Sequence, residues 1–87
     1  MDDLWVVYIL ESEKNGKRYS GMTRDFEKRL SEHNTGKSKF TSTLMPWKLV
    51  YKEMVSGTEN ARIREKYFKS GAGRRFIDKI VNSKNQD

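Results

Sequence analysis

The first part of the chain contains two strand-like segments separated by a polar turn. The segment from Trp5 to Leu10 is apolar on both alternating faces, and a second segment runs from Lys17 to Thr23. Asn15-Gly16 lies between them, and this pair favours a tight hairpin because both residues tolerate positive φ. We therefore predict an antiparallel hairpin whose first strand lies in the centre of a sheet.

A two-residue turn between these strands fixes which residues face each other. Ser12 then faces Tyr19, and Tyr8 faces Thr23. Because side chains alternate along a strand, this register places Tyr8 and Tyr19 on the same face, and a slip by one residue would separate them. Buried tyrosines are common in strands, so the shared face alone is more typical of packing than of chemistry.

The second strand contains a glycine, and a short helix follows it. Gly21 has no side chain, which allows a backbone or a phosphate to approach closely. The segment from Asp25 to Thr35 carries Phe26 and Leu30 on one helical face, and Gly36 follows it as a C-cap. We predict a helix there, followed by a loop from residue 36 to 46.

The second half of the chain predicts one strand and two helices. The strand runs from Trp47 to Val55, the next helix from Glu59 to Ser70 after an N-cap at Thr58, and the last from Gly73 to about Ser83. The strand is expected to place Trp47, Leu49 and Tyr51 on one face and Val50 and Met54 on the other. The first of these helices is expected to bury Ala61, Ile63, Tyr67 and Phe68.

Composition limits the class of protein. The 87 residues form one domain with a small core and contain no cysteine, which excludes a disulfide framework, a zinc knuckle and a thiol nucleophile. No segment is apolar enough to cross a bilayer, and the N-terminus lacks the order of a signal peptide, so we expect a cytoplasmic protein. Lys and Arg exceed Asp and Glu by 18 to 12, and this formal charge of +6 favours a polyanionic partner.

Two candidate site residues lie on the helix from residue 25 to 35. At 100° per residue His33 falls on the apolar stripe, and Arg29 borders the same stripe one turn earlier. Taken alone, His33 is more typical of a core-edge imidazole bonded to a carbonyl, and Arg29 of a snorkelling side chain. Together, and beside two tyrosines, they indicate a site.

Two further features have both a structural and a functional interpretation. The loop residues Lys37, Lys39, Thr41 and Ser42 suit phosphate oxygens, but a solvated connector explains them equally well. Glu65 flanks the buried stripe of its helix. It could form a surface ion pair with Lys69, or it could bind a hard cation such as Mg²⁺ together with waters and a substrate phosphate.

Several short motifs follow one another in a fixed order along the chain. They are Val6-Val7-Tyr8, Tyr19-Ser20-Gly21, Arg29, His33-Asn34-Thr35-Gly36 and Glu65. In this order and at these intervals they resemble the GIY-YIG endonucleases, in particular the small stand-alone bacterial members related to the excision-repair nuclease domain. The chain departs from the family pattern at Val6-Val7, at Ser20 and at Ile77, where several members carry Asn.

The resemblance implies a fold and an activity. The fold is an α/β (α+β) domain over residues 1–87, with a three-stranded antiparallel sheet flanked by helices in the order β-β-α-β-α-α. The activity is hydrolysis of phosphodiester bonds in DNA with one Mg²⁺ or Mn²⁺, in repair or recombination. RNA as the substrate and a protein partner that supplies specificity both stay open.

The resemblance also implies a role for each candidate residue. Tyr8 would activate or position the attacking water, and Tyr19 would orient the phosphate or assist the activation of the water. Arg29 would neutralise the charge that develops on the phosphate, and His33 would hydrogen-bond the site or relay a proton. Glu65 would hold the metal.

Two rival interpretations stay open from the sequence. A nucleic-acid-binding module without catalysis agrees equally well with the basic charge, the Lys-rich loop, Trp47 and Phe40, and a structural subunit of a larger complex is the other. The set of Tyr8, Arg29, His33 and Glu65 favours catalysis, because binding alone does not require it.

Overall fold

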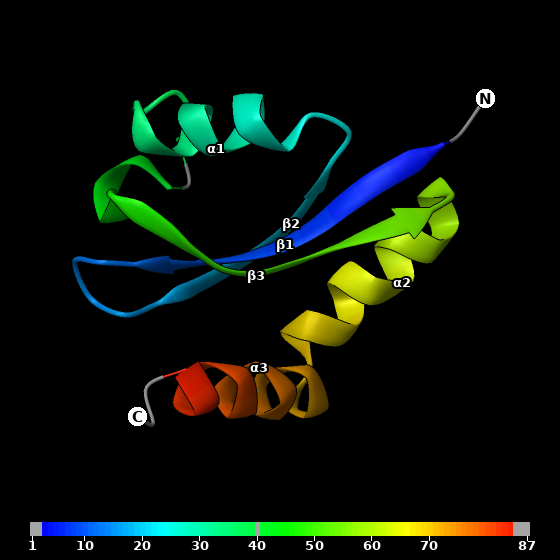
Figure 1. Cartoon of the computed structure of the whole chain (residues 1–87). Coiled ribbons are helices and arrows are strands. Elements are labelled where there is room, and N and C mark those ends of the chain that lie inside the picture. The colour runs from blue at the N-terminus through cyan, green and yellow to red at the C-terminus, as the bar shows by residue number, and fades with distance from the viewer. Residues whose placement is uncertain (1–2, 40, 85–87) are drawn as a thin grey trace.

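The computed structural model describes residues 3–39 and 41–84, so Phe40 lies outside the described residues. The strands and helices follow in the predicted order β-β-α-β-α-α and form an α+β fold (Figure 1). Their bounds are β1 (Leu4–Ser12), β2 (Arg18–Thr23), α1 (Phe26–Asn34), a 3₁₀ turn η1 (Ser42–Leu44), β3 (Trp47–Ser56), α2 (Thr58–Lys69) and α3 (Gly71–Lys84).

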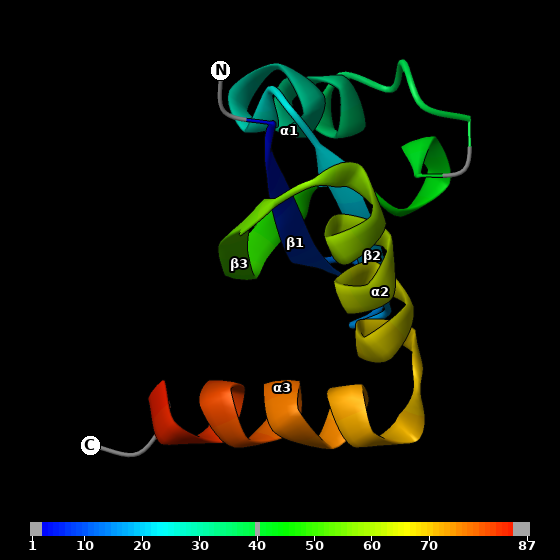
Figure 2. The same ribbon diagram turned by 90° about the vertical axis from the view of Figure 1, so that its right-hand side faces the viewer.

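The sheet separates the helices into two groups. Its strand order is β2-β1-β3 with antiparallel pairing throughout, which confirms the central position predicted for the first strand. Helix α1 covers one face, and α2 and α3 lie on the other (Figures 1 and 2). Strand β2 is therefore an edge strand, and groups from both faces can meet along it.

Strand β1 contributes to a separate core on each face. Val7 and Ile9 pack with Phe68 of α2 and Ile77 of α3, whereas Tyr8 packs on the α1 side. This division follows from the alternation of side chains along a strand that is apolar on both faces. The candidate site residue Tyr8 therefore lies on the α1 side of the sheet, away from the aliphatic core around Val7 and Ile9.

The hairpin register differs from the prediction by two residues. Tyr8 pairs with Gly21 and not with Thr23, and the pairing ends where the Ser12 N–H donates to the carbonyl of Lys17 at 2.8 Å. In the longer loop Gly16 has a φ of 79°, and no residue other than glycine has positive φ among those described. A type I′ turn would need positive φ at both central residues.

Ser12 explains why the loop is longer. Its hydroxyl is buried and accepts the backbone N–H groups of Lys14 and Asn15 at 3.1 and 3.3 Å, so this side chain organises the turn. A shift by two residues keeps every side chain on its predicted face, because the side-chain period of a strand is two. The shared face of Tyr8 and Tyr19 does not depend on the wrong register.

A β-bulge in β3 changes the face on which some of its side chains lie, so the predicted common face of Trp47 and Tyr51 is wrong. Ile9 pairs with Tyr51 while Leu10 pairs with Leu49, so Val50 is an extra residue without a partner on β1. As a result Trp47 packs with Tyr8 on one face, and Tyr51 packs against the core on the other. The prediction placed both residues on one face because it assumed regular alternation along β3, without the extra residue Val50.

The helix ends agree with the sequence more closely in α1 than in α2. In α1 the Asp25 carboxylate accepts the Lys28 N–H, and Gly36 follows the last turn with a φ of 82°. In α2 the N-cap is Gly57 and not Thr58, whose hydroxyl instead donates to Asp3 at 3.2 Å. This difference at the start of α2 leaves Glu65 within the predicted helix.

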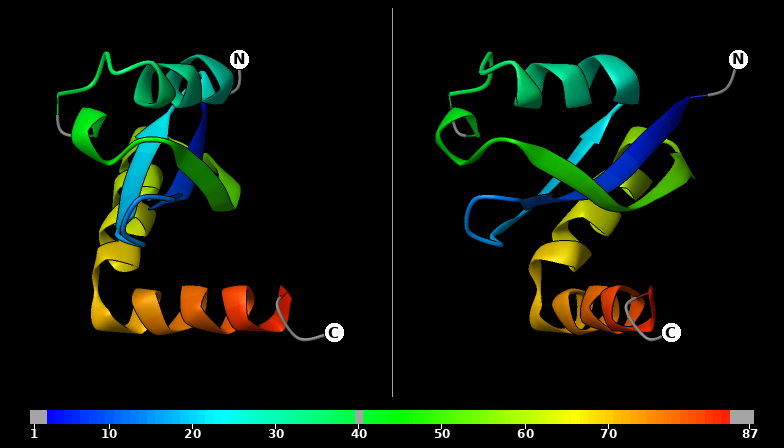
Figure 3. Two further views of the ribbon diagram at one scale, coloured as in Figure 1. Left: turned by 90° about the vertical axis from the view of Figure 1, so that its left-hand side faces the viewer. Right: turned by 60° about the vertical axis from the view of Figure 1, so that its left-hand side comes forward.

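Two further predictions about α2 and α3 are wrong. Ile63 was expected to be buried and is 64% exposed. Helix α3 begins at Gly71, two residues earlier than predicted. Gly73 lies so close to the backbone of Tyr67 and Phe68 that a Cβ there would overlap it, which lets α3 turn sharply away from α2 (Figure 3).

Within residues 3–39 and 41–84, no helix combines the length and the apolar character that are needed to cross a membrane.

Candidate active site

The two tyrosines of the hairpin meet above a glycine. Tyr8 and Tyr19 share the face covered by α1, with ring centroids 6.4 Å apart, as predicted. Tyr8 lies opposite Gly21, and a Cβ at Gly21 would overlap the Tyr8 hydroxyl. The close approach that the glycine allows is therefore made by a phenol and not by a backbone or a phosphate.

A buried imidazole connects the Tyr8 hydroxyl to a threonine hydroxyl. His33, in the last turn of α1, is 0% exposed, and its Nε2 lies 3.1 Å from the Tyr8 hydroxyl. Its Nδ1 lies 2.8 Å from Oγ1 of Thr41. A neutral imidazole can donate from one nitrogen and accept at the other, so both contacts can be hydrogen bonds. The alternative of a carbonyl partner for His33 is wrong.

Thr41 belongs to this buried chain of contacts and not to a phosphate-binding surface. It is 1% exposed, its hydroxyl faces His33, and its carbonyl accepts the indole N–H of Trp47 at 2.9 Å. The phosphate contact considered for Thr41 does not agree with this burial of its hydroxyl. Of the other loop residues, Lys37 and Lys39 are exposed, and Ser42 is half-buried.

An amide side chain fixes this loop relative to α1. Asn34 accepts the backbone N–H of Trp47 at 2.6 Å and donates to its carbonyl at 3.0 Å. The pair holds the start of β3 beside the last turn of α1, so that Thr41 faces His33. Sequence reasoning did not predict the roles of Asn34 and Thr41. The position of Asn34 directly after His33, at the end of the helix, was the one feature of the sequence that could have indicated its role.

Arg29 lies one turn before His33 and faces both phenols. Its guanidinium donates to Glu32 at 3.1 Å and is partly buried. Burial lowers the pKa of Arg29, but the hydrogen bond to Glu32 and the interactions with Tyr8 and Tyr19 outweigh this effect and raise it. Arg29 thus carries its charge at every working pH, beside the two hydroxyls.

The protonation states of Tyr8 and His33 are set by their burial. Burial raises the pKa of Tyr8 to about 12, and the charges of Tyr19 and Glu65 add to this while Arg29 opposes it. Burial also lowers the pKa of His33, helped by the charge of Arg29 and opposed by Glu32. At neutral pH the site therefore contains a protonated phenol and a neutral imidazole.

The lowered pKa of His33 predicts a pH-dependent stability. A folded-state pKa below the unfolded value of about 6.5 gives stability that is present above that value and is lost as the pH falls through the folded-state pKa. We expect the free energy of unfolding to decrease between pH 7 and pH 5, measured by urea denaturation. The His33→Gln variant should show a smaller decrease, and equal pH dependence in both proteins would contradict the assignment.

Glu65 approaches the site from the other face of the sheet. It lies on α2, its side chain is 26% exposed, and its charge is close enough to raise the pKa of Tyr8. The predicted ion pair with Lys69 is present, although the two atoms are 3.7 Å apart. A contact of this length at the surface contributes little and leaves the carboxylate able to accept another partner.

The donor set limits the kind of metal site. No cluster of three or more His, Asp or Glu side chains suitable for a metal occurs within the described part of the chain. Mg²⁺ is commonly held by one or two carboxylates, with waters and substrate phosphates as the other ligands. Glu65 fits that pattern, and a site built from protein ligands alone does not.

The sequence of residues 4–76 matches the GIY-YIG catalytic domain. This chain belongs to the GIY-YIG family. It is 36% identical over 81 residues to a UPF0213 protein from Streptococcus agalactiae, which covers 92% of this chain and 91% of that protein. It is 47% identical over 66 residues to a UPF0213 protein from Syntrophus aciditrophicus, covering 72% and 74%. GIY-YIG domains define a nuclease family.

A solved structure shows the same similarity. The solution NMR structure of a UPF0213 protein from Bacillus halodurans is 32% identical, covers 95% of this chain and 87% of that chain, and has a TM-score of 0.53. In the present GIY-YIG domain the two motif segments meet at the pair Tyr8 and Gly21. Ile77 is 1% exposed and packs in the core with Val7, Ile9 and Phe68.

Proposed function

We propose that this protein is a divalent-metal-dependent endonuclease that hydrolyses phosphodiester bonds in DNA. The observation that carries the proposal is the hydrogen bond between the Tyr8 hydroxyl and the buried His33, formed beside the permanent charge of Arg29 and within the electrostatic reach of Glu65. A buried tyrosine that only packs needs one hydrogen-bond partner, whereas this phenol also has two charged side chains near it. The formal charge of +6 adds a general attraction to the phosphate backbone.

The transition state of phosphodiester hydrolysis gathers negative charge on the phosphate oxygens. Arg29 supplies a fixed positive charge for these oxygens, and Tyr19, which is less buried than Tyr8, can donate a hydrogen bond to the phosphate. Both groups are positioned before substrate binds, so little reorganisation is needed. Their role is to hold the phosphate and to stabilise the charge that develops on it.

Tyr8 cannot act as a base in the free protein. With a pKa of about 12 its phenol stays protonated at neutral pH and can only donate or accept a hydrogen bond. A cation near the hydroxyl favours the phenolate and so moves the pKa down. His33 can accept a hydrogen bond from the Tyr8 hydroxyl at Nε2 while it donates from Nδ1 to Thr41, and this pair of contacts fixes the orientation of the phenol.

Glu65 would hold Mg²⁺ or Mn²⁺, and a bound ion supplies positive charge to the phosphate and lowers the pKa of a coordinated water. The partly exposed carboxylate, with Lys69 as a distant partner, can take up this ligand role without breaking a strong contact. Among the described residues no set of three ligating side chains surrounds an ion, so the ion is expected to need the phosphate of bound DNA as a further ligand, whereas DNA can bind without the ion.

A non-catalytic nucleic-acid-binding module is the second candidate. Two observations favour it: Tyr8 is 1% exposed, and the described residues contain no cluster of three potential metal ligands. In this case Arg29 and Tyr19 would contact phosphates without cleavage. Binding of DNA would then be independent of a divalent metal.

A cleavage assay separates the two functions. We expect labelled linear and branched DNAs to be cut with Mg²⁺ or Mn²⁺ and to stay intact with a chelator. Faster cutting of branched DNA would support a role in repair or recombination, and a matched RNA panel tests the choice of substrate. Retained binding without cleavage under every condition would instead identify a binding module.

A further inference from the structure

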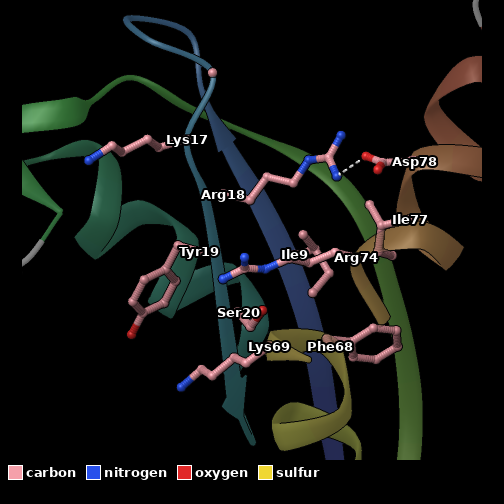
Figure 4. A pocket seen from close by; sticks show the side chains of 11 residues that line it. Ile9, Lys17, Arg18, Tyr19, Ser20, Phe68, Lys69, Arg74, Ile77 and Asp78 are labelled. Carbon is pink, nitrogen blue, oxygen red and sulfur yellow. Dashed lines mark hydrogen bonds and ion pairs between the residues drawn. The ribbon is translucent and has the colours of Figure 1, made fainter. Parts of the chain in front are cut away.

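A groove runs along the edge strand β2 on the side of the sheet that α2 and α3 cover. It has a volume of about 640 Å³, and we call it the edge groove. Ile9, Phe68 and Ile77 form its apolar floor. Its polar rim consists of Lys17, Arg18 and Tyr19 from the hairpin, Lys69 from α2, and Arg74 and Asp78 from α3 (Figure 4).

The edge groove continues from the candidate active site. Tyr19 lines the groove and also packs against Tyr8 and His33, with ring centroids 6.4 and 4.9 Å apart. Lys69 lines the groove and forms the ion pair with Glu65. A nucleic-acid strand with one phosphate beside Tyr8 and Tyr19 can therefore extend into the edge groove.

The rim carries more basic than acidic side chains. It contains four cationic side chains and only one carboxylate, Asp78. Asp78 is bound to Arg18 at 2.5 Å, and Arg18 also contacts Glu11 at 3.3 Å. Among the residues that the structure describes, neither Lys17 nor Arg74 forms an ion pair. In Figure 4 the Arg74 side chain extends from α3 toward β2.

We propose that the edge groove binds phosphate groups of the nucleic-acid strand next to the phosphate held at Tyr8 and Arg29, with Arg74 and Lys17 as the main donors. This inference rests on the proposed function. Basic side chains that extend from the hairpin turn at Lys17 to Arg74 on α3 suit successive phosphates better than one small anion. The apolar floor suits the sugar faces between those phosphates. Asp78 competes with the strand for Arg18.

Charge-matched variants of α3 test the groove. Arg74→Gln removes a groove cation, Arg75→Gln removes an equal charge from the neighbouring exposed position outside the groove, and Asp78→Asn removes the competing carboxylate. Binding of a labelled DNA oligonucleotide is measured by fluorescence anisotropy in a chelator over a series of salt concentrations, so that cleavage does not interfere. Thermal unfolding verifies that each variant is folded.

We expect Arg74→Gln to weaken binding about tenfold and to lower the log–log salt slope by about 0.7 to 0.9, as one lost phosphate contact predicts. Arg75→Gln should change the dissociation constant by less than about twofold, since an exposed charge away from the bound strand is screened by salt. Asp78→Asn should strengthen binding.

The outcomes distinguish this inference from the proposed function. The proposal that the edge groove binds phosphates would be overturned by equal dissociation constants and salt slopes for Arg74→Gln and Arg75→Gln. Weaker DNA binding by Asp78→Asn would also overturn it. Metal-dependent cleavage by the parent protein would still stand in that case. A parent protein that binds no DNA at low salt would overturn both.

Discussion

The Glu65→Gln variant is expected to lose at least about 100-fold in cleavage rate with Mg²⁺, because a bound ion contributes several kcal/mol of charge stabilisation in the transition state. The substitution keeps the size of the side chain and removes the charge that holds the ion. Folding should be retained, since the contact with Lys69 spans 3.7 Å at the surface and is worth about 0.3–0.5 kcal/mol. DNA binding in a chelator should persist.

Glu59→Gln is the matched control for this substitution. Glu59 is an exposed carboxylate in the first turn of the same helix, so its replacement makes the same change in charge away from the tyrosines. Cleavage by this variant should equal that of the parent. A folded Glu65→Gln protein that cuts DNA at the parent rate in Mg²⁺ would show that the residue is only a surface ion-pair partner.

The sequence predicts the fold well because its signals are local and agree with one another. A strand that is apolar on both faces, a glycine after α1 and the periodicity of α2 and α3 each point to the observed order of elements. The shared face of Tyr8 and Tyr19 also follows from the sequence, since only the parity of the register matters. The register itself does not follow, because the Ser12 hydroxyl stabilises a longer turn than Asn15-Gly16 alone predicts.

The candidate site could be predicted only where residues on one helix or on one hairpin define it. Arg29 and His33 share a helix, so their common face can be calculated from the sequence. The contact between His33 and Thr41 depends on how the loop folds back onto α1, and nothing local indicates it. The bulge at Val50 has the same origin, because it depends on pairing between distant segments.

These observations make the Tyr8 hydroxyl the group whose removal should be most informative. Tyr8→Phe deletes one oxygen, and the ring keeps its contacts with Phe26 and Tyr19 at centroid distances of 5.5 and 6.4 Å. The loss of the hydroxyl leaves Nε2 of the buried His33 without its partner, which should cost about 1–3 kcal/mol of stability. We expect cleavage at saturating DNA and Mg²⁺ to fall by about 100-fold or more, as for the loss of a positioned group in a catalytic site.

Tyr51→Phe separates the catalytic contribution from a general effect on stability. Tyr51 is partly buried against the core on the opposite face of the sheet, and its hydroxyl donates to Glu53 at 2.8 Å, so the same atom and one hydrogen bond are removed away from the candidate site. Both variants should unfold at lower urea concentration than the parent, but only Tyr8→Phe should lose cleavage at a temperature where both are folded. Equal rates for the two variants would mean that the Tyr8 hydroxyl only stabilises His33 and takes no part in hydrolysis.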